Sequence, residues 1–264
     1  MSTRPLAVVT GASSGIGYEL ARELAHRGYD LVITAENEEI TDAAMHCERL
    51  GAQVTAALAD LRDPEEVERF ATQAQASGRP VDVLAVNAGV GASGDFVTDT
   101  TLADSLAVVD LNVRSAVYLA KLMVPAMVDR GSGRLLFTSS IAATSPGPFQ
   151  TVYHASKAFL QFFAQGLREE LRGRGVTVTA LMPGPTETRF FERAGMTDTK
   201  LGAGPKDPAS EVAKQAVDAM LAGKDHVVAG SVRNRVQAVA GRVLPDRWLT
   251  AVQRRVSAPG TARR

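Results

Sequence analysis

The sequence of 264 residues contains a single cysteine, Cys47, so it cannot form an internal disulfide. Its four histidines, His26, His46, His154 and His226, have no spacing typical of metal ligands, and we expect no metal site. Basic and acidic residues number 29 each, which leaves no net charge to favour a nucleic-acid partner. No apolar run approaches the roughly 18 residues of a membrane span, and the N-terminus lacks the apolar stretch of a signal peptide. We therefore expect a cytoplasmic protein with no transmembrane segment.

What the sequence does contain is an alternation of short β-branched runs with longer stretches of helical period, which is typical of a parallel sheet. Apolar residues make up 45% of the chain, enough at this length for one large core. Right-handed crossovers then favour a single doubly wound α/β domain of the Rossmann type, with seven parallel strands and helices on both faces. The predicted strands are Leu6–Thr10, Asp30–Thr34, Gln53–Ala57, Val81–Val86, Arg134–Ser139, Val176–Leu181 and His226–Ala229. The predicted helices include Ile16–Arg27, Pro64–Gln75, Leu111–Met127 and Ala155–Leu171.

Two segments interrupt this alternation. Residues 183–208 are rich in Gly and Pro but carry Phe190 and Phe191, which favours a substrate lid at about 185–208 over a plain surface excursion. Residues 231–264 hold eight arginines and one acidic residue, and their apolar residues recur at helical spacing. We expect a dinucleotide-binding and catalytic domain at 1–230, followed by a basic, helical extension at 231–264. The extension could pack on another subunit, on the acidic remainder of this chain or on an anionic membrane, and we favour protein.

A glycine-rich turn, TGASSGIG at residues 10–17, follows the first predicted strand and opens the first predicted helix. Glycines at positions 11, 15 and 17 let the backbone approach a pyrophosphate, and a helix N-terminus supplies free N–H groups. The spacing of these glycines is not that of the GxGxxG fingerprint, so the motif alone is weak evidence. Glu36, just beyond the second strand, stands where a carboxylate can accept from the adenosine ribose; a solvated loop glutamate is the alternative. Together these features predict a dinucleotide site.

This turn and the motifs further along resemble the short-chain dehydrogenases/reductases, from about Leu6 to Ala229. Asp60 in ALADLRD is similar to the residue that holds the adenine, and NAG at 87–89 is similar to the turn after the family's fourth strand. Val86 departs from the pattern, because members often have a second asparagine there, and this bears on strand packing. The resemblance implies an NAD(P)-dependent oxidoreductase that transfers a hydride between a nicotinamide cofactor and a ketone or secondary alcohol.

The resemblance also implies which residues form the site. Asn112, Ser140, Tyr153 and Lys157 resemble the family's catalytic set, with Ser140 preferred to Ser139 because the family's serine usually lies thirteen residues before the tyrosine. Tyr153 would exchange a proton with the substrate oxygen, which Ser140 would hold. Lys157 would also bind the nicotinamide ribose, and Asn112 would position a water unless it only caps or kinks a helix. The implied cofactor-binding residues are Gly11, Ser13, Ser14, Gly15, Ile16, Gly17, Glu36, Asp60, Leu61, Asn87, Ala88, Gly89, Tyr153, Lys157, Pro183, Gly184, Thr186 and Thr188.

The spacing of Tyr153 and Lys157 in TVYHASKAF has its own physical reading. Residues four apart share one face of a helix. Lowering the pKa of a phenol by about three units requires roughly 4 kcal/mol, which one cation about 4 Å away supplies at an effective dielectric of about 20. We therefore expect Lys157 to lower the pKa of Tyr153, with desolvation opposing it; chance pairing is the alternative. A helix turns neighbours to different faces, so we expect His154 to be a spectator.

The predicted cofactor is NAD, because Glu36 would repel the 2′-phosphate of NADP and no basic residue lies in the glycine loop. NADP stays open, since Arg62 could fold over the adenosine. Arg189 or Arg193 could hold an acidic substrate group, but arginines of a lid more often face solvent. The predicted substrate is a small apolar ketone or alcohol, with pocket walls at Val90–Ser93, Ile141, Phe149, Val152, Phe190, Phe191 and Met196.

Two further possibilities concern the molecule as a whole. The family resemblance implies a homodimer or homotetramer built through the helices around residues 101–130 and 153–172. The alternative to an enzyme is a catalytically silent nucleotide-binding sensor or scaffold protein on the same fold.

Overall fold

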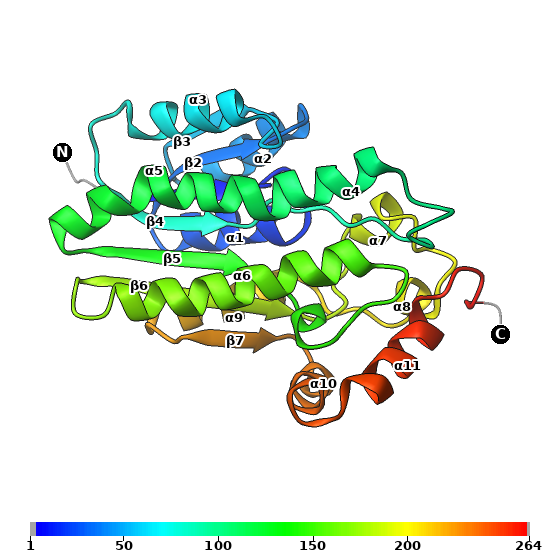
Figure 1. Ribbon diagram of the computed structural model, residues 1–264. Helices are drawn as coiled ribbons and strands as arrows, with labels where there is room; N and C mark the ends of the chain where they lie inside the picture. Colours follow the sequence, from blue (N-terminus) through cyan, green and yellow to red (C-terminus); the bar gives the residue numbers. More distant parts are fainter. Residues whose placement is uncertain (1–3, 263–264) are drawn as a thin grey trace.

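The computed structural model of the protein describes residues 4–262, without the side chain of Arg242. One parallel sheet forms its centre, with strand order β3-β2-β1-β4-β5-β6-β7 (Figure 1). The order reverses direction at β1, as in a doubly wound fold, which confirms the predicted α/β class and the seven parallel strands. The strands are β1 Leu6–Thr10, β2 Asp30–Ala35, β3 Val54–Leu58, β4 Val81–Val86, β5 Gly133–Thr138, β6 Val176–Pro183 and β7 His226–Ala229.

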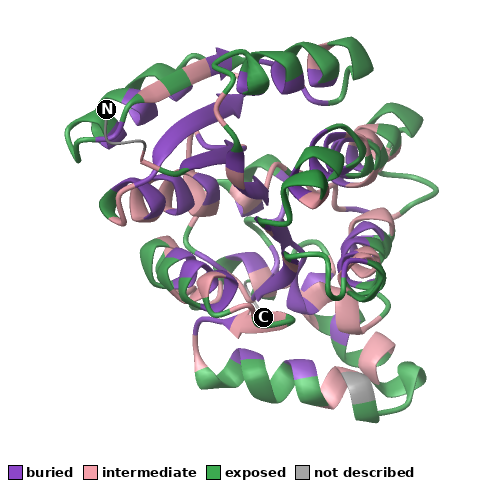
Figure 2. Ribbon diagram, turned by 90° about the vertical axis from the view of Figure 1, so that its left-hand side faces the viewer, coloured by how far each residue is buried: buried purple, intermediate pink, exposed green. Residues whose placement is uncertain are grey.

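Helices cover both faces of the sheet and bury two separate apolar clusters. One cluster places Phe70, Leu119 and Leu160, from α3, α5 and α6, against the sheet. The other places Leu20, Ile40 and residues of α9 against the opposite face. The central strands are accordingly buried along most of their length, between helices whose outer sides are exposed (Figure 2). The helices up to β7 are α1 Gly15–His26, α2 Glu39–Glu48, α3 Pro64–Gln75, α4 Leu102–Val109, α5 Ser115–Arg130, α6 Thr151–Glu170, α7 Phe190–Arg193, α8 Lys200–Ala203 and α9 Ala209–Leu221.

The predicted helix Leu111–Met127 is wrong in its bounds. A capping box of Thr101 with Asp104 starts α4 nine residues earlier than its predicted first residue. A π-helical turn, η1 Asp110–Arg114, then joins α4 to α5, which continues to Arg130. The π-turn contains Asn112, whose side chain bonds outside the helix, and such turns often mark functional positions. Helix α6 also begins earlier than predicted, at Thr151, whereas α3 has its predicted bounds and its cap at Asp63.

Cys47 lies in the apolar cluster beneath α2 and is fully buried. Burial raises the pKa of its thiol to about 11, which suits a packing residue rather than a nucleophile. Among residues 4–262 no three His, Cys, Asp or Glu side chains gather into a group that could hold a metal ion.

The extension after Ser231 consists of α10 Val232–Val243 and α11 Asp246–Ser257. Their inner sides pack on the rest of the chain: Ala238 and Asn234 of α10 are buried, as are Gln253 and Ser257 of α11. Helix α10 lies against β7 and the 3-10 turn η2 Ile141–Thr144, and α11 lies beside α8 (Figure 1). The last two arginines of the basic segment, Arg263 and Arg264, are outside the described residues. None of the helices within residues 4–262 is long and apolar enough to span a bilayer.

The central sheet generates a prediction about stability. Leu135 of β5 is completely buried, whereas Leu58 at the end of edge strand β3 is 48% exposed. We expect Leu135→Ala to lower the free energy of unfolding by about 2–5 kcal/mol, because it leaves a cavity in the core. Leu58→Ala should change it by less than about 1 kcal/mol. Urea denaturation followed by circular dichroism measures both, and equal losses would contradict the described core.

Candidate active site

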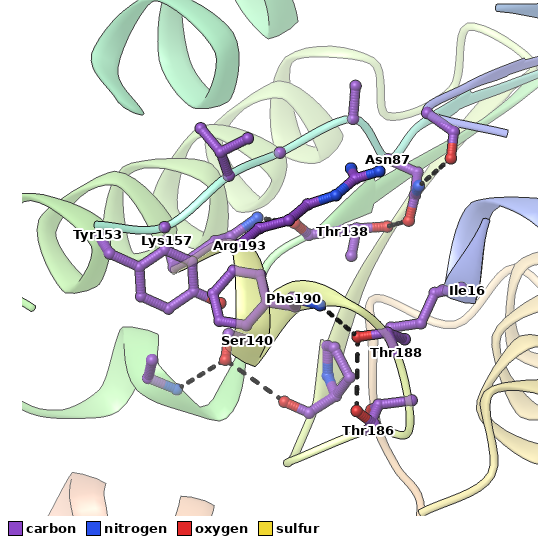
Figure 3. A pocket seen from close by; sticks show the side chains of 18 of the residues that line it. Ile16, Asn87, Thr138, Ser140, Tyr153, Lys157, Thr186, Thr188, Phe190 and Arg193 are labelled. Atoms are coloured by element: carbon purple, nitrogen blue, oxygen red, sulfur yellow. Dashed lines mark hydrogen bonds between the residues drawn. The ribbon is translucent and has the colours of Figure 1, made fainter. Parts of the chain in front are cut away.

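The carboxyl ends of β1, β4, β5 and β6 meet at one edge of the sheet and line a single large cavity. A hydrogen-bond chain ties these ends together. The Thr10 hydroxyl accepts from the backbone N–H groups of Asn87 and Ala88, each at 3.0 Å. The Asn87 side chain donates to the Thr10 carbonyl at 3.1 Å. It also accepts from the Thr138 hydroxyl at 3.1 Å (Figure 3). The cavity floor is thus held by side chains whose polar groups are satisfied within it.

The glycine-rich turn leaves room for a ligand only because it has no side chains at key points. Gly11 has a φ of 66°, a left-handed conformation that favours glycine. A Cβ on Gly17 would lie 2.1 Å from the Gly11 carbonyl oxygen and 2.4 Å from Nδ2 of Asn87. Ser14 makes no side-chain cap on α1, so the first N–H groups of this 12-residue helix point at the cavity without a side-chain partner. Together, the tight backbone and free N–H groups fit a pyrophosphate.

The outer end of the cavity carries a charged triad on the loops after β2 and β3. Arg62 contacts Glu36 at 3.2 Å and Asp60 at 2.8 Å, and all three side chains are 40–42% exposed. The hydrogen bond from Arg62 lowers the pKa of the Asp60 carboxyl, with burial opposing it. Glu36 and Asp60 both line the cavity, so this end presents two carboxylates, which are paired with the Arg62 guanidinium.

Tyr153 and Ser140 lie together at the inner end. The Ser140 hydroxyl accepts from the Ala142 N–H at 3.1 Å and donates to the Pro183 carbonyl oxygen at 3.4 Å (Figure 3). Ser139 faces elsewhere, donating to the Lys157 carbonyl at 2.8 Å. Burial raises the pKa of Tyr153 to about 12, although the Ser140 side chain acts to lower it.

Lys157 shares the face of α6 that carries Tyr153, but its ammonium does not bond the phenol. Nζ donates to the Thr138 carbonyl at 2.9 Å and lies 5.7 Å from the centre of the Tyr153 ring. Burial lowers the pKa of Lys157 to about 8. The prediction that Lys157 lowers the pKa of Tyr153 is therefore wrong for the protein as this structure describes it, because desolvation outweighs the attraction at this distance.

Asn112 stands behind the site rather than in the cavity. Its Oδ1 accepts from the Val90 N–H at 2.9 Å, and Nδ2 donates to the Val90 carbonyl and the Ser156 hydroxyl, each at 2.9 Å. A Cβ on Gly89 would lie 3.1 Å from Asn112 Oδ1 and 3.2 Å from Lys157 Nζ. Asn112 thus holds the 88–91 turn against the lysine.

The segment predicted as a lid, 185–208, contributes several side chains to the lining of the cavity. Phe190 packs with its ring centre 5.0 Å from that of Tyr153, and Arg193 reaches along the cavity toward Asn87 (Figure 3). Arg189 crosses to the other side, where Nη1 donates to Glu39 of α2 at 2.8 Å. The lid is therefore joined by an ion pair to the nucleoside side of the cavity.

Most residues predicted for the site surround this one cavity. Of the predicted set, only Gly17 and Asn112 do not line it; both lie directly behind residues that do. Among the predicted pocket walls, Val90, Gly91, Ile141, Phe190 and Phe191 line the cavity. The other walls are wrong, and Met196 among them is completely buried beneath the lid. Those that do not line the cavity are Ala92, Ser93, Phe149, Val152 and Met196.

A polar part of the lining was not predicted from the sequence. His154, predicted to be a spectator, lines the cavity and is only 4% exposed. Four further polar residues of the lining come from three separate segments of the chain, Ser145, Gln150, Gln237 and Gln253. Nothing in their local sequence indicates a shared site, because only the packing of α10 and α11 on η2 and α6 brings them together.

Comparison with known proteins points to one family. The family model for short chain dehydrogenases matches residues 5–198. The chain is 38% identical over 201 residues to 1-deoxy-11-beta-hydroxypentalenate dehydrogenase of Streptomyces exfoliatus, covering 75% of this chain and 72% of that protein. A short-chain dehydrogenase from Sphingobium yanoikuyae, solved with NADPH, superposes with a TM-score of 0.80 at 30% identity, covering 90% of this chain and 92% of that one. One from Burkholderia phymatum, solved with NAD, has the same fold, with a TM-score of 0.83 at 22% identity and 97% of both chains covered.

The glycine cradle generates the second prediction. Gly17→Ala should abolish nucleotide binding, because the new Cβ displaces Gly11 and Asn87 from the positions that leave room for phosphates. Gly166→Ala in α6 is the matched control, since a Cβ there meets no atom within 4 Å. Isothermal titration calorimetry with NAD and NADP measures both variants. Tight binding by Gly17→Ala would show that this turn is not the phosphate site.

Proposed function

The chain belongs to the short-chain dehydrogenase family and is an oxidoreductase that uses a nicotinamide cofactor, and on that premise we propose that it interconverts a ketone and a secondary alcohol with Tyr153 as general acid and base. The observation that carries this proposal is that Ser140, Tyr153 and Lys157 line the same cavity as the glycine cradle, with Lys157 Nζ 5.7 Å from the centre of the Tyr153 ring. A bound nicotinamide supplies or accepts the hydride. The chain's own residues would handle the proton and the substrate oxygen.

The cradle at the N-terminus of α1 would hold the pyrophosphate, and the turn Asn87–Gly89 would flank the ring half of the cofactor. Ser140 would hold the substrate oxygen against the Tyr153 hydroxyl. With a pKa of about 12, the phenol keeps its proton at neutral pH and so stands ready to donate it to a carbonyl oxygen. Lys157 would stabilise the phenolate that remains, being the cation closest to the ring among the described side chains.

Tyr153→Phe tests this role. The substitution removes the proton donor while it keeps the ring, so we expect turnover of carbonyl substrates to fall by about 10²–10⁴-fold. Cofactor affinity should stay nearly unchanged, because the phosphate cradle is intact. Steady-state kinetics on a panel of ketones, together with calorimetric titration of the cofactor, measures the two effects separately.

The same experiment distinguishes the enzyme from the alternative, a silent nucleotide-binding sensor or scaffold. Wild-type protein that binds cofactor but turns over no carbonyl compound in a way that depends on Tyr153 would favour the sensor. Tyr118→Phe is the matched control, because its hydroxyl is on the surface and bonds Glu68 outside the cavity.

We propose NAD as the preferred cofactor. Glu36 lines the nucleoside end of the cavity and would accept from ribose hydroxyls, whereas it would repel a 2′-phosphate. Arg62 is the opposing feature, since it lies between Glu36 and Asp60 and could turn toward a phosphate. Because Arg62 is already paired with two carboxylates, moving it would leave both of them near the phosphate.

Kinetics with both cofactors tests this preference. We expect kcat/KM to be at least about tenfold higher with NAD, the ratio that roughly 1.4 kcal/mol of repulsion produces. Glu36→Ala should raise kcat/KM with NADP above the wild-type value. Arg62→Gln should lower kcat/KM with NADP below the wild-type value. Glu38→Ala, an exposed acid outside the cavity, is the control. A tenfold preference of the wild type for NADP would overturn the role assigned to Glu36.

We also propose that the protein assembles as a homodimer or homotetramer through α4, α5 and α6. These helices carry exposed apolar side chains on their outer sides, at Leu102, Leu106, Val109, Val117, Leu122, Phe159 and Phe162. Such a set on one protein surface favours contact with another subunit. A cytoplasmic location stays a prediction.

A further inference from the structure

The C-terminal extension contributes to the cavity that contains Tyr153. Gln237 of α10 and Gln253 of α11 both line that cavity, together with Gln150 and His154 from the start of α6. Three of these side chains are almost completely removed from solvent, with exposures of 3% for Gln150, 4% for His154 and 8% for Gln253. Buried polar groups of this kind are costly unless hydrogen bonds satisfy them, so their placement calls for partners.

Hydrogen bonds fix the tautomer of His154 and the orientation of the Gln253 amide. Nδ1 of His154 lies 2.9 Å from the Ser145 carbonyl oxygen, which can only accept, so Nδ1 carries the proton. Burial lowers the pKa of His154, while the backbone carbonyls of Ser145 and Ala142 act to raise it. In the neutral ring Nε2 is then an acceptor, and Nε2 of Gln253 donates to it at 3.4 Å.

The amide nitrogens of both buried glutamines are therefore used within the protein. Nε2 of Gln253 also donates to the Ser257 hydroxyl at 3.1 Å, and Nε2 of Gln150 donates to the same hydroxyl at 3.3 Å. Within residues 4–262 no donor bonds the carbonyl oxygen of either glutamine, and neither oxygen is among the buried atoms that lack a partner. Both oxygens thus stay accessible, and both residues line the cavity. The opposite orientation of the Gln253 amide is unfavourable, because it would place the amide oxygen against the lone pair on Nε2 of His154.

We propose that Gln150 and Gln253, with α11 as their support, form a hydrogen-bond-accepting wall of the substrate pocket, and that the substrate carries a hydroxyl or amide N–H group in addition to its reacting carbonyl. The wall is next to the reaction centre, because the His154 and Tyr153 ring centres are 6.1 Å apart. No charged side chain belongs to this cluster, which selects a neutral donor over an ion. This inference rests on the proposed function for the identity of the reacting group.

The wall also explains a feature of the fold. The His154 ring packs flat on Gly147, where a Cβ would lie 2.1 Å from the ring, so the loop after η2 is shaped to seat this histidine. Gly241 of α10 meets Thr144 in the same way, at 2.3 Å. Helix α10 of the extension is thus closely fitted to the turn η2, which precedes the residues of the wall.

The test uses pairs of ketones of equal size, in which one member carries a hydroxyl where the other carries a methyl group. Each ketone is titrated into the full-length protein in the presence of saturating NAD, and its affinity is measured by calorimetry. We expect the wild type to bind the hydroxyl-bearing member of at least one pair about tenfold more tightly, as one hydrogen bond to a buried acceptor supports. Gln253→Leu should remove this preference. Gln253→Met, which keeps the length of the side chain, should do the same if Gln253→Leu does not fold. Val252→Ala is the control and should keep the preference, because Val252 is a residue of α11 that is 60% exposed.

Turnover of the same pairs separates this inference from the proposed function. Equal affinities within every pair in the wild type would overturn the accepting wall even if the ketones are reduced. A preference that survives in Gln253→Met would overturn the assignment to Gln253. A Gln253-dependent preference without any turnover would support the wall and count against the proposed reaction.

Discussion

The chemistry of this protein depends on how far the protein shields Tyr153 and Lys157 from water, since Lys157 is buried and Tyr153 is partly buried. Burial moves the two pKa values apart, raising that of the phenol to about 12 and lowering that of the ammonium to about 8. Both groups consequently favour their neutral forms more than they would in water. The phenol therefore stays protonated at neutral pH and can donate its proton to a substrate oxygen. A positive charge beside them would act on both groups more strongly than it would in water, because the surrounding protein lowers the effective dielectric. Residues of the segment 185–208 and of α10 and α11 line this cavity and so take part in shielding the pair.

Much of this architecture could be predicted from residues alone. Short β-branched runs predict a buried parallel sheet, and the glycine turn, Glu36 and Asp60 follow strands whose carboxyl ends must meet at one edge. Spacing on a helix was sufficient to place Tyr153 and Lys157 on one face of α6. Spacing was not sufficient to predict the pKa values of the two groups. These depend on how deeply the pair is buried and on the hydrogen bond from the Lys157 ammonium to the Thr138 carbonyl. The helix break at Asn112 was missed for a similar reason, since the bonds to Val90 and Ser156 that stabilise the π-turn are tertiary.

The substrate side of the cavity was harder to predict than the cofactor side, and the difference has a physical cause. The cofactor residues sit at the ends of strands, where backbone geometry fixes their positions from one strand to the next. The substrate residues come from the lid, from the segment 145–154 and from α10 and α11, whose relative placement is set by side-chain packing between distant parts of the chain. Apolar residues such as Met196 and Val152 looked suitable from composition, yet Met196 is used to build the lid itself. The cavity wall at this side is instead lined by buried polar residues that carry no local sequence signal, above all Gln253.

Closure of the site involves two contacts of different strength. The Arg189–Glu39 ion pair joins the lid to the nucleoside side, but both side chains are nearly half exposed, so solvent screens it and it adds little to stability. Helix α11 instead inserts Gln253 and Ser257, both buried, into the hydrogen-bond network of α6. Breaking that network would leave several buried polar groups unpaired, which costs more than breaking an exposed ion pair. Of the two contacts, that of α11 therefore contributes more to the stability of the pocket than the Arg189–Glu39 pair does.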